Sequence, residues 1–157
     1  MSEVEIRSVL VPLHGVELLI PNAVIAEVIG YSDPDPIDDA PDWLLGGVLW
    51  RGWQVPVVAY AQLVGLSERE PTEGAKICVT KSLAGNQRMP YIGLLAQSYP
   101  RLVTVREDAL TEVPEPAGHI AIAGRAILAD RECVVPELDR FAQLVAHAAF
   151  GALPVGH

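Results

Sequence analysis

Short apolar runs separated by turn-forming residues follow one another along most of the chain, and they are rich in the branched residues that β-strands favour. The first two runs, over 5–13 and 16–20, flank a His-Gly turn and predict a β-hairpin. A proline then starts a brief helical turn, and another strand is predicted over 26–29. The chain therefore begins as a series of short strands.

The next hairpin is strongly apolar. Its two strands lie within 46–60 and meet at Arg51 and Gly52, where glycine permits a positive φ angle. A short helix is predicted over 61–66. The charged, proline-containing stretch 67–74 has the composition of a surface connector. This connector divides the predicted strands into two halves.

Strands resume after the connector, and the pattern ends in a helix. The strands are predicted at 76–83, 90–97, 102–105, 120–129 and 133–138, with turns at 84–86 and 130–132. The segment 139–150 carries an apolar stripe at helical spacing, and Asp139 is placed to cap it. We expect an amphipathic helix that docks on the strands.

The two halves share a loose internal repeat of strand, turn, Val-Pro-containing strand and helix. Pro56 lies just ahead of the helical run 61–64 in the first half, and Pro136 lies just ahead of 141–145 in the second. No helix long enough for a crossover separates the strands, which argues against a βαβ arrangement. The pattern predicts an all-β fold, either barrels or sandwiches, and two small packed barrels would fit it.

Composition favours a single folded domain. The chain has 157 residues, half of them hydrophobic, and its formal net charge of -9 argues against a nucleic-acid partner. Cys78 and Cys133 lie inside apolar runs and are expected to be free, buried thiols. The acidic start lacks the basic flank of a signal peptide, and no apolar run approaches the ~20 residues that span a bilayer. We expect a cytoplasmic protein without direct membrane insertion.

The sequence offers no catalytic or cofactor-binding motif. Its four histidines are scattered without metal-ligand spacing, and neither a nucleophile elbow nor a phosphate-binding or dinucleotide loop occurs. The stretch 32–42 holds five aspartates but lacks the ligand spacing of a calcium loop, so it is interpreted as a solvated loop. We expect no enzyme, no cofactor and no metal site.

One charged residue stands out in the apolar hairpin. Arg51 lies between Trp50 and Trp53, and arginine and tryptophan are the residue types enriched in binding hot spots. The alternative is a turn arginine whose stem rests on an indole. Composition favours neither interpretation over the other.

The residues around this arginine match a known signature. The segment from Gly46 to Val58 reads Gly-Gly-Val-Leu-Trp-Arg-Gly-Trp-Gln-Val-Pro-Val-Val, and it resembles the G-x-x-x-L-R-G-x-x-x-P-v-x-D-L signature of CheW-like adaptor domains. Further agreement lies at Glu27, at Gly30 and Tyr31, over 91–96, and from Gly124 to Phe141. The resemblance covers nearly the whole chain.

The fold that this resemblance implies is two SH3-like five-stranded barrels packed together, with short helices and a C-terminal helix. We expect a single CheW-like domain over 1–157. One subdomain is placed at about 16–83, and the other at about 84–137 together with the N-terminal strand, followed by the helix 139–150.

The function that the resemblance implies is that of an adaptor in a two-component chemosensory array, at membrane-associated receptors. Its partners would be the signalling domain of a methyl-accepting chemoreceptor, lying along the groove between the barrels, and the regulatory domain of a histidine kinase. The implied partner-binding positions are Ile25, Val28, Arg51, Gly52, Trp53 and Gly93. Alternatively, Ile25 and Val28 belong to the core, while Gly52 and Gly93 serve only backbone geometry.

The chain also departs from the signature. Leu49 replaces its asparagine, Ala59 replaces its aspartate, and Tyr60 stands where leucine is common. Together with Trp50 and Trp53, these changes predict a reshaped hairpin with specialised partner choice, such as that of a chemosensory system for pilus-driven twitching motility. Two alternatives stay open: a degenerate scaffold that binds another assembly protein, or a small-barrel ligand-binding protein or enzyme.

Overall fold

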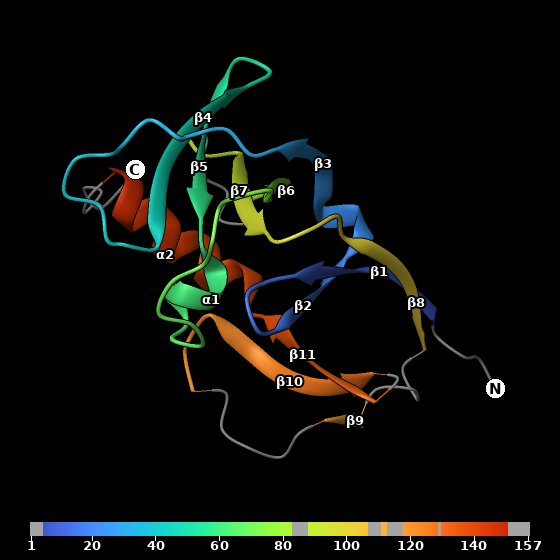
Figure 1. Ribbon diagram of the computed structural model, residues 1–157. Coiled ribbons are helices and arrows are strands. Elements are labelled where there is room, and N and C mark those ends of the chain that lie inside the picture. Colours follow the sequence, from blue (N-terminus) through green and yellow to red (C-terminus); the bar gives the residue numbers. More distant parts are fainter. Residues whose placement is uncertain (1–4, 83–87, 107–110, 113–117, 129, 151–157) are drawn as a thin grey trace.

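The computed structural model describes residues 5–82, 88–106, 111–112, 118–128 and 130–150, which form two β-sheets and three helices (Figure 1). The five-stranded sheet has the order β3 (Ile25–Gly30), β6 (Lys76–Lys81), β7 (Tyr91–Ala96), β5 (Trp53–Val58) and β4 (Leu44–Trp50). The six-stranded sheet has the order β8 (Arg101–Arg106), β1 (Glu5–Pro12), β2 (Glu17–Pro21), β11 (Arg131–Pro136), β10 (Ile122–Leu128) and β9 (Thr111–Glu112). The helices are η1 (Asn22–Val24), α1 (Tyr60–Leu63) and α2 (Leu138–Phe150).

The sheets confirm the predicted fold class and hairpins, and they correct the predicted subdomain ranges. A boundary near residue 84 separates β6 from β7, yet these two strands pair along their whole length. Likewise β2 belongs to the six-stranded sheet, because it pairs with β1 and β11. The five-stranded sheet is therefore built from β3 to β7 in sequence, and the six-stranded sheet from both ends of the chain.

The internal repeat appears in the topology of both sheets. In the five-stranded sheet the edge strand β3 lies beside the hairpin β6–β7, which lies beside the hairpin β4–β5. In the six-stranded sheet β8 lies beside the hairpin β1–β2, which lies beside the hairpin β10–β11. The two hairpins of each sheet meet in a parallel pair, β7 with β5 and β2 with β11. The register shifts once in the hairpin β4–β5, after Leu44, and once in the hairpin β10–β11, after Ile122. Helix α1 follows the hairpin β4–β5, and helix α2 follows the hairpin β10–β11.

The strand pairing fixes which positions of the two halves correspond. Pro56 pairs with Gly47, and the residue in the equivalent place of the second hairpin is Val134, which pairs with Arg125. Pro136 is therefore not the counterpart of Pro56. The positions that correspond one to one are Leu44 with Ile122, Gly46 with Gly124, Val58 with Pro136, and Tyr60 with Leu138.

Four apolar clusters are buried among the described residues. The central strands supply residues to clusters inside their own sheets and to the largest cluster, between the two sheets, which is called the junction cluster here. In β6, Ile77 and Val79 pack inside the five-stranded sheet, whereas Cys78 between them faces the junction between the sheets. In β1, Leu10 packs inside the six-stranded sheet and its neighbour Val9 faces the junction. Because side chains alternate along a strand, both faces of these strands are buried.

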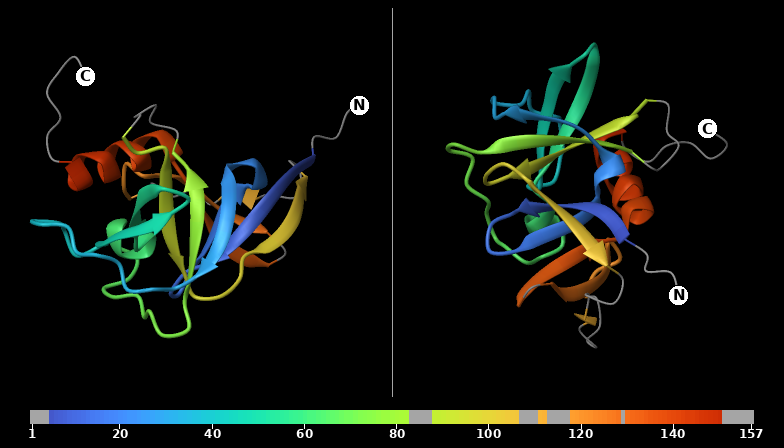
Figure 2. Two further views of the ribbon diagram at one scale, coloured as in Figure 1. Left: turned by 90° about the horizontal axis from the view of Figure 1, so that it is seen from above. Right: turned by 90° about the vertical axis from the view of Figure 1, so that its right-hand side faces the viewer.

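Helix α2 runs along the junction between the sheets (Figures 1 and 2). Its buried residues Phe141, Ala142, Val145 and Ala146 belong to the junction cluster, as the amphipathic pattern predicts. The predicted cap is wrong. The helix starts one residue earlier than expected, so Glu137 takes the capping place and its Oε2 accepts the Arg140 N–H at 3.0 Å.

The stretch 32–42 is more than a solvated loop, because it pairs with the edge of β4. Asp35 exchanges two backbone hydrogen bonds with Gly47, each at 2.8 Å. A side chain at Gly46 would overlap the Asp35 carbonyl, which explains the glycine there. The loop thus covers part of an otherwise open edge.

Both cysteines are buried and free, as predicted. Burial raises the pKa of the Cys78 thiol to about 12, and burial together with the charge of Glu17 raises that of Cys133. At neutral pH both thiols stay protonated and behave as small hydrophobic side chains.

Tyr60, in α1, joins the two sheets. It is fully buried, its hydroxyl donates to the Ala121 carbonyl ahead of β10 at 2.8 Å, and its ring lies edge-on to Phe141 with centroids 5.4 Å apart. Burial raises its pKa, so the phenol stays neutral and continues to donate.

Replacing Tyr60 with phenylalanine should therefore lower the free energy of unfolding by about 1 kcal/mol, since the ring contact remains and one buried hydrogen bond is lost. Denaturant unfolding measures the change. Tyr99→Phe, at an exposed tyrosine, is the matched control and should leave stability unchanged. Equal stability of Tyr60→Phe and the original protein would show that the hydroxyl contributes nothing.

Candidate partner-binding site

The turn between β4 and β5 places Arg51 at the tip of a hairpin that projects from the five-stranded sheet (Figure 1). Arg51 and Gly52 both have positive φ angles, 48° and 82°, and Trp50 pairs with Trp53 across them. Two such residues are typical of the tight turns that suit the twist of a hairpin. This conformation is ordinary for Gly52 but uncommon for an arginine, and such strain clusters at functional sites.

Glu27, on β3, holds this turn in place. Its Oε1 accepts hydrogen bonds from the Trp50 indole at 2.9 Å and from Arg51 Nη2 at 3.1 Å. Since β3 and β4 are the two edges of the five-stranded sheet, this carboxylate joins the edges and closes the sheet at that end. The Arg51 side chain remains 70% exposed, so the ion pair alone adds little stability.

Aromatic rings pack against the residues of this turn. The Tyr91 ring lies edge-on to Trp50, with centroids 4.8 Å apart, and 6.5 Å from Trp53. The Arg51 guanidinium lies 5.0 Å from the Trp50 ring centroid. Arg51 thus rests on an indole, as one of the two interpretations holds, and its exposure also leaves it free to meet a partner. The hot-spot interpretation stays a prediction.

Ile25 and Val28 lie on the other face of β3. A β-bulge between Ile25 and Glu27 shifts the alternation by one residue, which puts Ile25 and Val28 on one face and Glu27 on the opposite one. Both apolar residues are half-buried against the junction cluster. Ile25 and Val28 therefore lie at the edge of the core between the sheets, where part of each side chain stays exposed.

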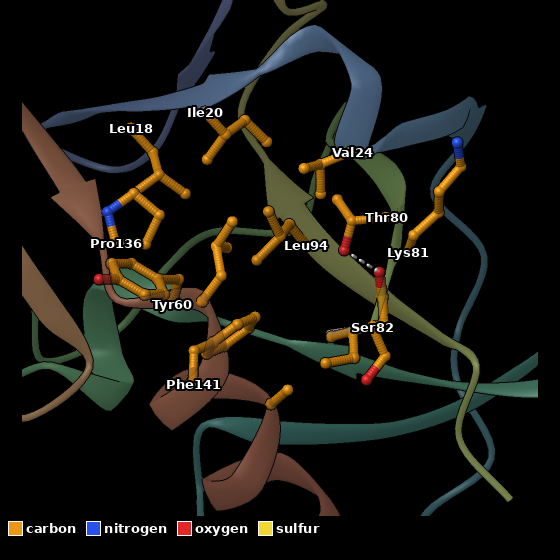
Figure 3. Close-up of a pocket in the computed structure, with 13 residues that line it drawn as sticks. Leu18, Ile20, Val24, Tyr60, Thr80, Lys81, Ser82, Leu94, Pro136 and Phe141 are labelled. Atoms are coloured by element: carbon orange, nitrogen blue, oxygen red, sulfur yellow. Dashed lines mark hydrogen bonds between the residues drawn. The ribbon is translucent and has the colours of Figure 1, made fainter. Parts of the chain in front are cut away.

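The space between the sheets is filled by side chains (Figure 3). Leu18 and Ile20 on β2, Leu94 on β7, and Tyr60 and Phe141 on the helices point into one small cavity. The volume within it that the centre of a water molecule can occupy is about 10 Å³, so the cavity has room for one water at most. This cavity is therefore too small to admit an element of another protein.

Gly93 lies in the interior. It is buried in β7, and a Cβ atom there would come within 2.8 Å of Ile77 Cγ2. The structure thus gives this glycine a packing role and no direct surface for a partner.

The departures from the signature lie in different environments. Leu49 is 75% exposed on the hairpin, whereas Ala59 and Tyr60 are fully buried. Only Leu49 of these three can touch a partner. Ala59 packs with Ala75 and Leu95 inside the sheet, so it offers no surface of its own to a partner.

Two residues of this site were absent from the predicted set, namely Glu27 and Tyr91. Glu27 is the single acid in an apolar strand, a signal that sequence reasoning used only to support the family match. Tyr91 gave no comparable signal, because its contact with Trp50 depends on the folding of β7 beside β5.

Within the described part of the chain, no group of three metal-ligating side chains comes together. No helix among the described residues is long and apolar enough to cross a membrane.

Comparison with known proteins agrees with this architecture. A family model described as the CheW-like domain matches residues 7–146. The chain belongs to the CheW-like family. A "Chemotaxis protein CheW" of Rhizobium meliloti (strain 1021) is 27% identical to this CheW-like protein over 126 residues, which cover 74% of this chain and 78% of that one.

The CheW-like fold is also found in a solved structure. The crystal structure of scaffolding protein TtCheW from Thermoanaerobacter tengcongensis matches with a TM-score of 0.71 and 17% sequence identity, covering 86% of each chain. The two SH3-like subdomains of this fold correspond to the two sheets described above. The six-stranded sheet exceeds the expected five strands by the two-residue strand β9.

Replacing Gly93 with alanine should lower the free energy of unfolding by about 1–3 kcal/mol, because the added methyl group overpacks the sheet against Ile77. Gly30→Ala is the control, since nothing lies within 4 Å of a Cβ atom there. Thermal unfolding of both variants tests this. If Gly93→Ala weakened partner binding with full stability, the packing role would be contradicted.

Proposed function

We propose that this CheW-like protein is a non-catalytic adaptor that couples a chemoreceptor signalling domain to the regulatory domain of a histidine kinase in a chemosensory array. The observation that carries the proposal is the hairpin tip, where a fixed and exposed arginine is presented by Glu27 and Trp50. The family membership and the relative named as a chemotaxis protein support it. We place the protein in the cytoplasm, at membrane-associated receptor arrays.

The two groups of predicted site residues suit two contacts. Arg51 and Trp53 lie at the hairpin tip, and Trp53 is 41% exposed there. Ile25 and Val28 lie on the opposite face of β3, at the rim of the junction between the sheets. An adaptor that joins two proteins needs separate surfaces. The two surfaces here meet at opposite faces of β3, because Glu27 on one face holds the hairpin tip while Ile25 and Val28 lie on the other. We assign the hairpin tip to an acidic group of one partner, since the guanidinium offers donors that Glu27 does not use.

The alternative of a degenerate scaffold loses part of its motivation, because Ala59 lies in the interior. Leu49 and the two tryptophans remain as grounds for specialised partner choice. The link to pilus-driven twitching motility stays a prediction.

An Arg51→Glu variant should lose at least about tenfold in affinity for the receptor signalling domain or the kinase regulatory domain, as expected for a hot-spot arginine. Co-elution and calorimetric titration with each purified domain measure the loss. Arg51→Lys keeps the charge and removes the forked geometry, so an intermediate affinity is expected.

Arg140→Glu is the matched control, because it makes the same charge change at an exposed position of α2. The control should bind as the original protein does. Unchanged affinity of a folded Arg51→Glu variant would remove Arg51 from the site, and failure of the original protein to bind either domain would overturn the proposed function.

A further inference from the structure

Helix α1 begins at a residue that cannot cap it. Ala59 occupies the capping position and forms no side-chain hydrogen bond to the helix. The signature that this chain resembles has an aspartate at this place, and aspartate is among the preferred capping residues. The N–H groups of the first turn, including those of Ala61 and Gln62, therefore need an acceptor from elsewhere.

Glu70 brings such an acceptor to the helix from the following connection. This carboxylate is only 5% exposed, and its Oε2 accepts the Gln62 N–H at 3.3 Å. The N–H groups of Ala61, in the same helical turn, and of His14, in the turn between β1 and β2, also favour its charged form. Its Oε1 is buried and has no donor in full hydrogen-bonding geometry within the part of the chain described.

The chain around Glu70 is folded back to make this contact. The N–H groups of Leu66 and Ser67 both donate to the Ala61 carbonyl, at 2.8 and 3.1 Å, and the Ser67 hydroxyl donates to the Arg69 carbonyl at 3.1 Å. These bonds turn the connection toward the start of α1. A buried carboxylate is costly, so its placement here requires compensation from the groups it meets.

We propose that Glu70 supplies, from outside the helix, the cap that an aspartate at position 59 would supply, and that it thereby positions α1 at the junction of the two sheets. Glu70 contacts α1 beside the five-stranded sheet and lies by the β1–β2 turn of the six-stranded sheet. Tyr60, the first residue of α1, carries the hydrogen bond between the sheets. The loss of the aspartate at position 59 is therefore compensated and is no sign of a degenerate adaptor. This inference holds whether or not the proposed partners are correct.

Burial raises the pKa of Glu70 above its ordinary value of 4.5, while the backbone N–H groups of Gln62, His14 and Ala61 and the charge of His14 oppose the increase. A carboxyl whose pKa is raised in the folded state stabilises the fold fully only at low pH, and this contribution is lost as the pH rises through the raised pKa. Glu70→Gln should remove that part of the pH dependence of stability.

The test is a double-mutant cycle between Glu70→Ala and Ala59→Ser. Serine adds a single oxygen at a packed position and is a strong capping residue. Amide hydrogen exchange of Ala61 and Gln62 should become at least about tenfold faster in Glu70→Ala, relative to the amides of β6 and β7, because the first turn loses its acceptor. Adding Ala59→Ser should restore slow exchange in the Glu70→Ala background and change little when Glu70 is present.

Glu73→Ala is the matched control, since it removes an exposed carboxylate from the same connection. It should leave exchange at Ala61 and Gln62 unchanged. If Glu70→Ala lowered the midpoint of unfolding without selectively speeding these two amides, Glu70 would be space-filling only. The proposal would also be overturned if Ala59→Ser gave the same change with and without Glu70, and Ala59→Asn provides a second capping variant should the serine variant fail to fold.

Discussion

The burial of the central strands on both faces is the constraint on which this structure depends. β1, β2, β6 and β7 each direct alternate residues into a sheet interior and into the junction between the sheets. Helices α1 and α2 fill the rest of that junction. Little room remains for a ligand in the cavity between the sheets, and the predicted partner contacts lie at the hairpin tip and on the edge strand β3. The adaptor proposal agrees with this division, because it needs exposed contacts.

One carboxylate oxygen, Oε1 of Glu27, holds the hairpin tip in place. An exposed ion pair between Glu27 and Arg51 would be weak, yet the same oxygen accepts the indole of the buried Trp50 and joins both edges of the sheet. The arginine is thereby held in an uncommon backbone conformation with most of its side chain in solvent. A partner would meet a group that is already ordered, which reduces the entropy lost on binding.

The strand pattern could be predicted from the sequence because alternation and turn residues are local signals. The two hairpins, the tight turn at Arg51 and the helix α2 follow from neighbouring residues alone. Long-range pairing has no local signal, so the membership of β2 and β7 in their sheets, the position of Gly93 in the interior and the contact between Glu27 and Trp50 could not be derived. The burial of Ala59 could not be derived for the same reason, since it depends on residues that are distant in sequence, Ala75 and Leu95.

The origin of the sheets in the chain has a consequence for the order of folding. The five-stranded sheet uses the continuous stretch from β3 to β7, whereas the six-stranded sheet pairs β1 and β2 with strands made after β7. During synthesis the five-stranded sheet can be completed first, while the initial hairpin waits with both faces uncovered. Pairing of β2 with β11 closes a loop of most of the chain, which is a slow step by its contact order. The N-terminal hairpin is thus the segment that is exposed longest to aggregation and to chaperones.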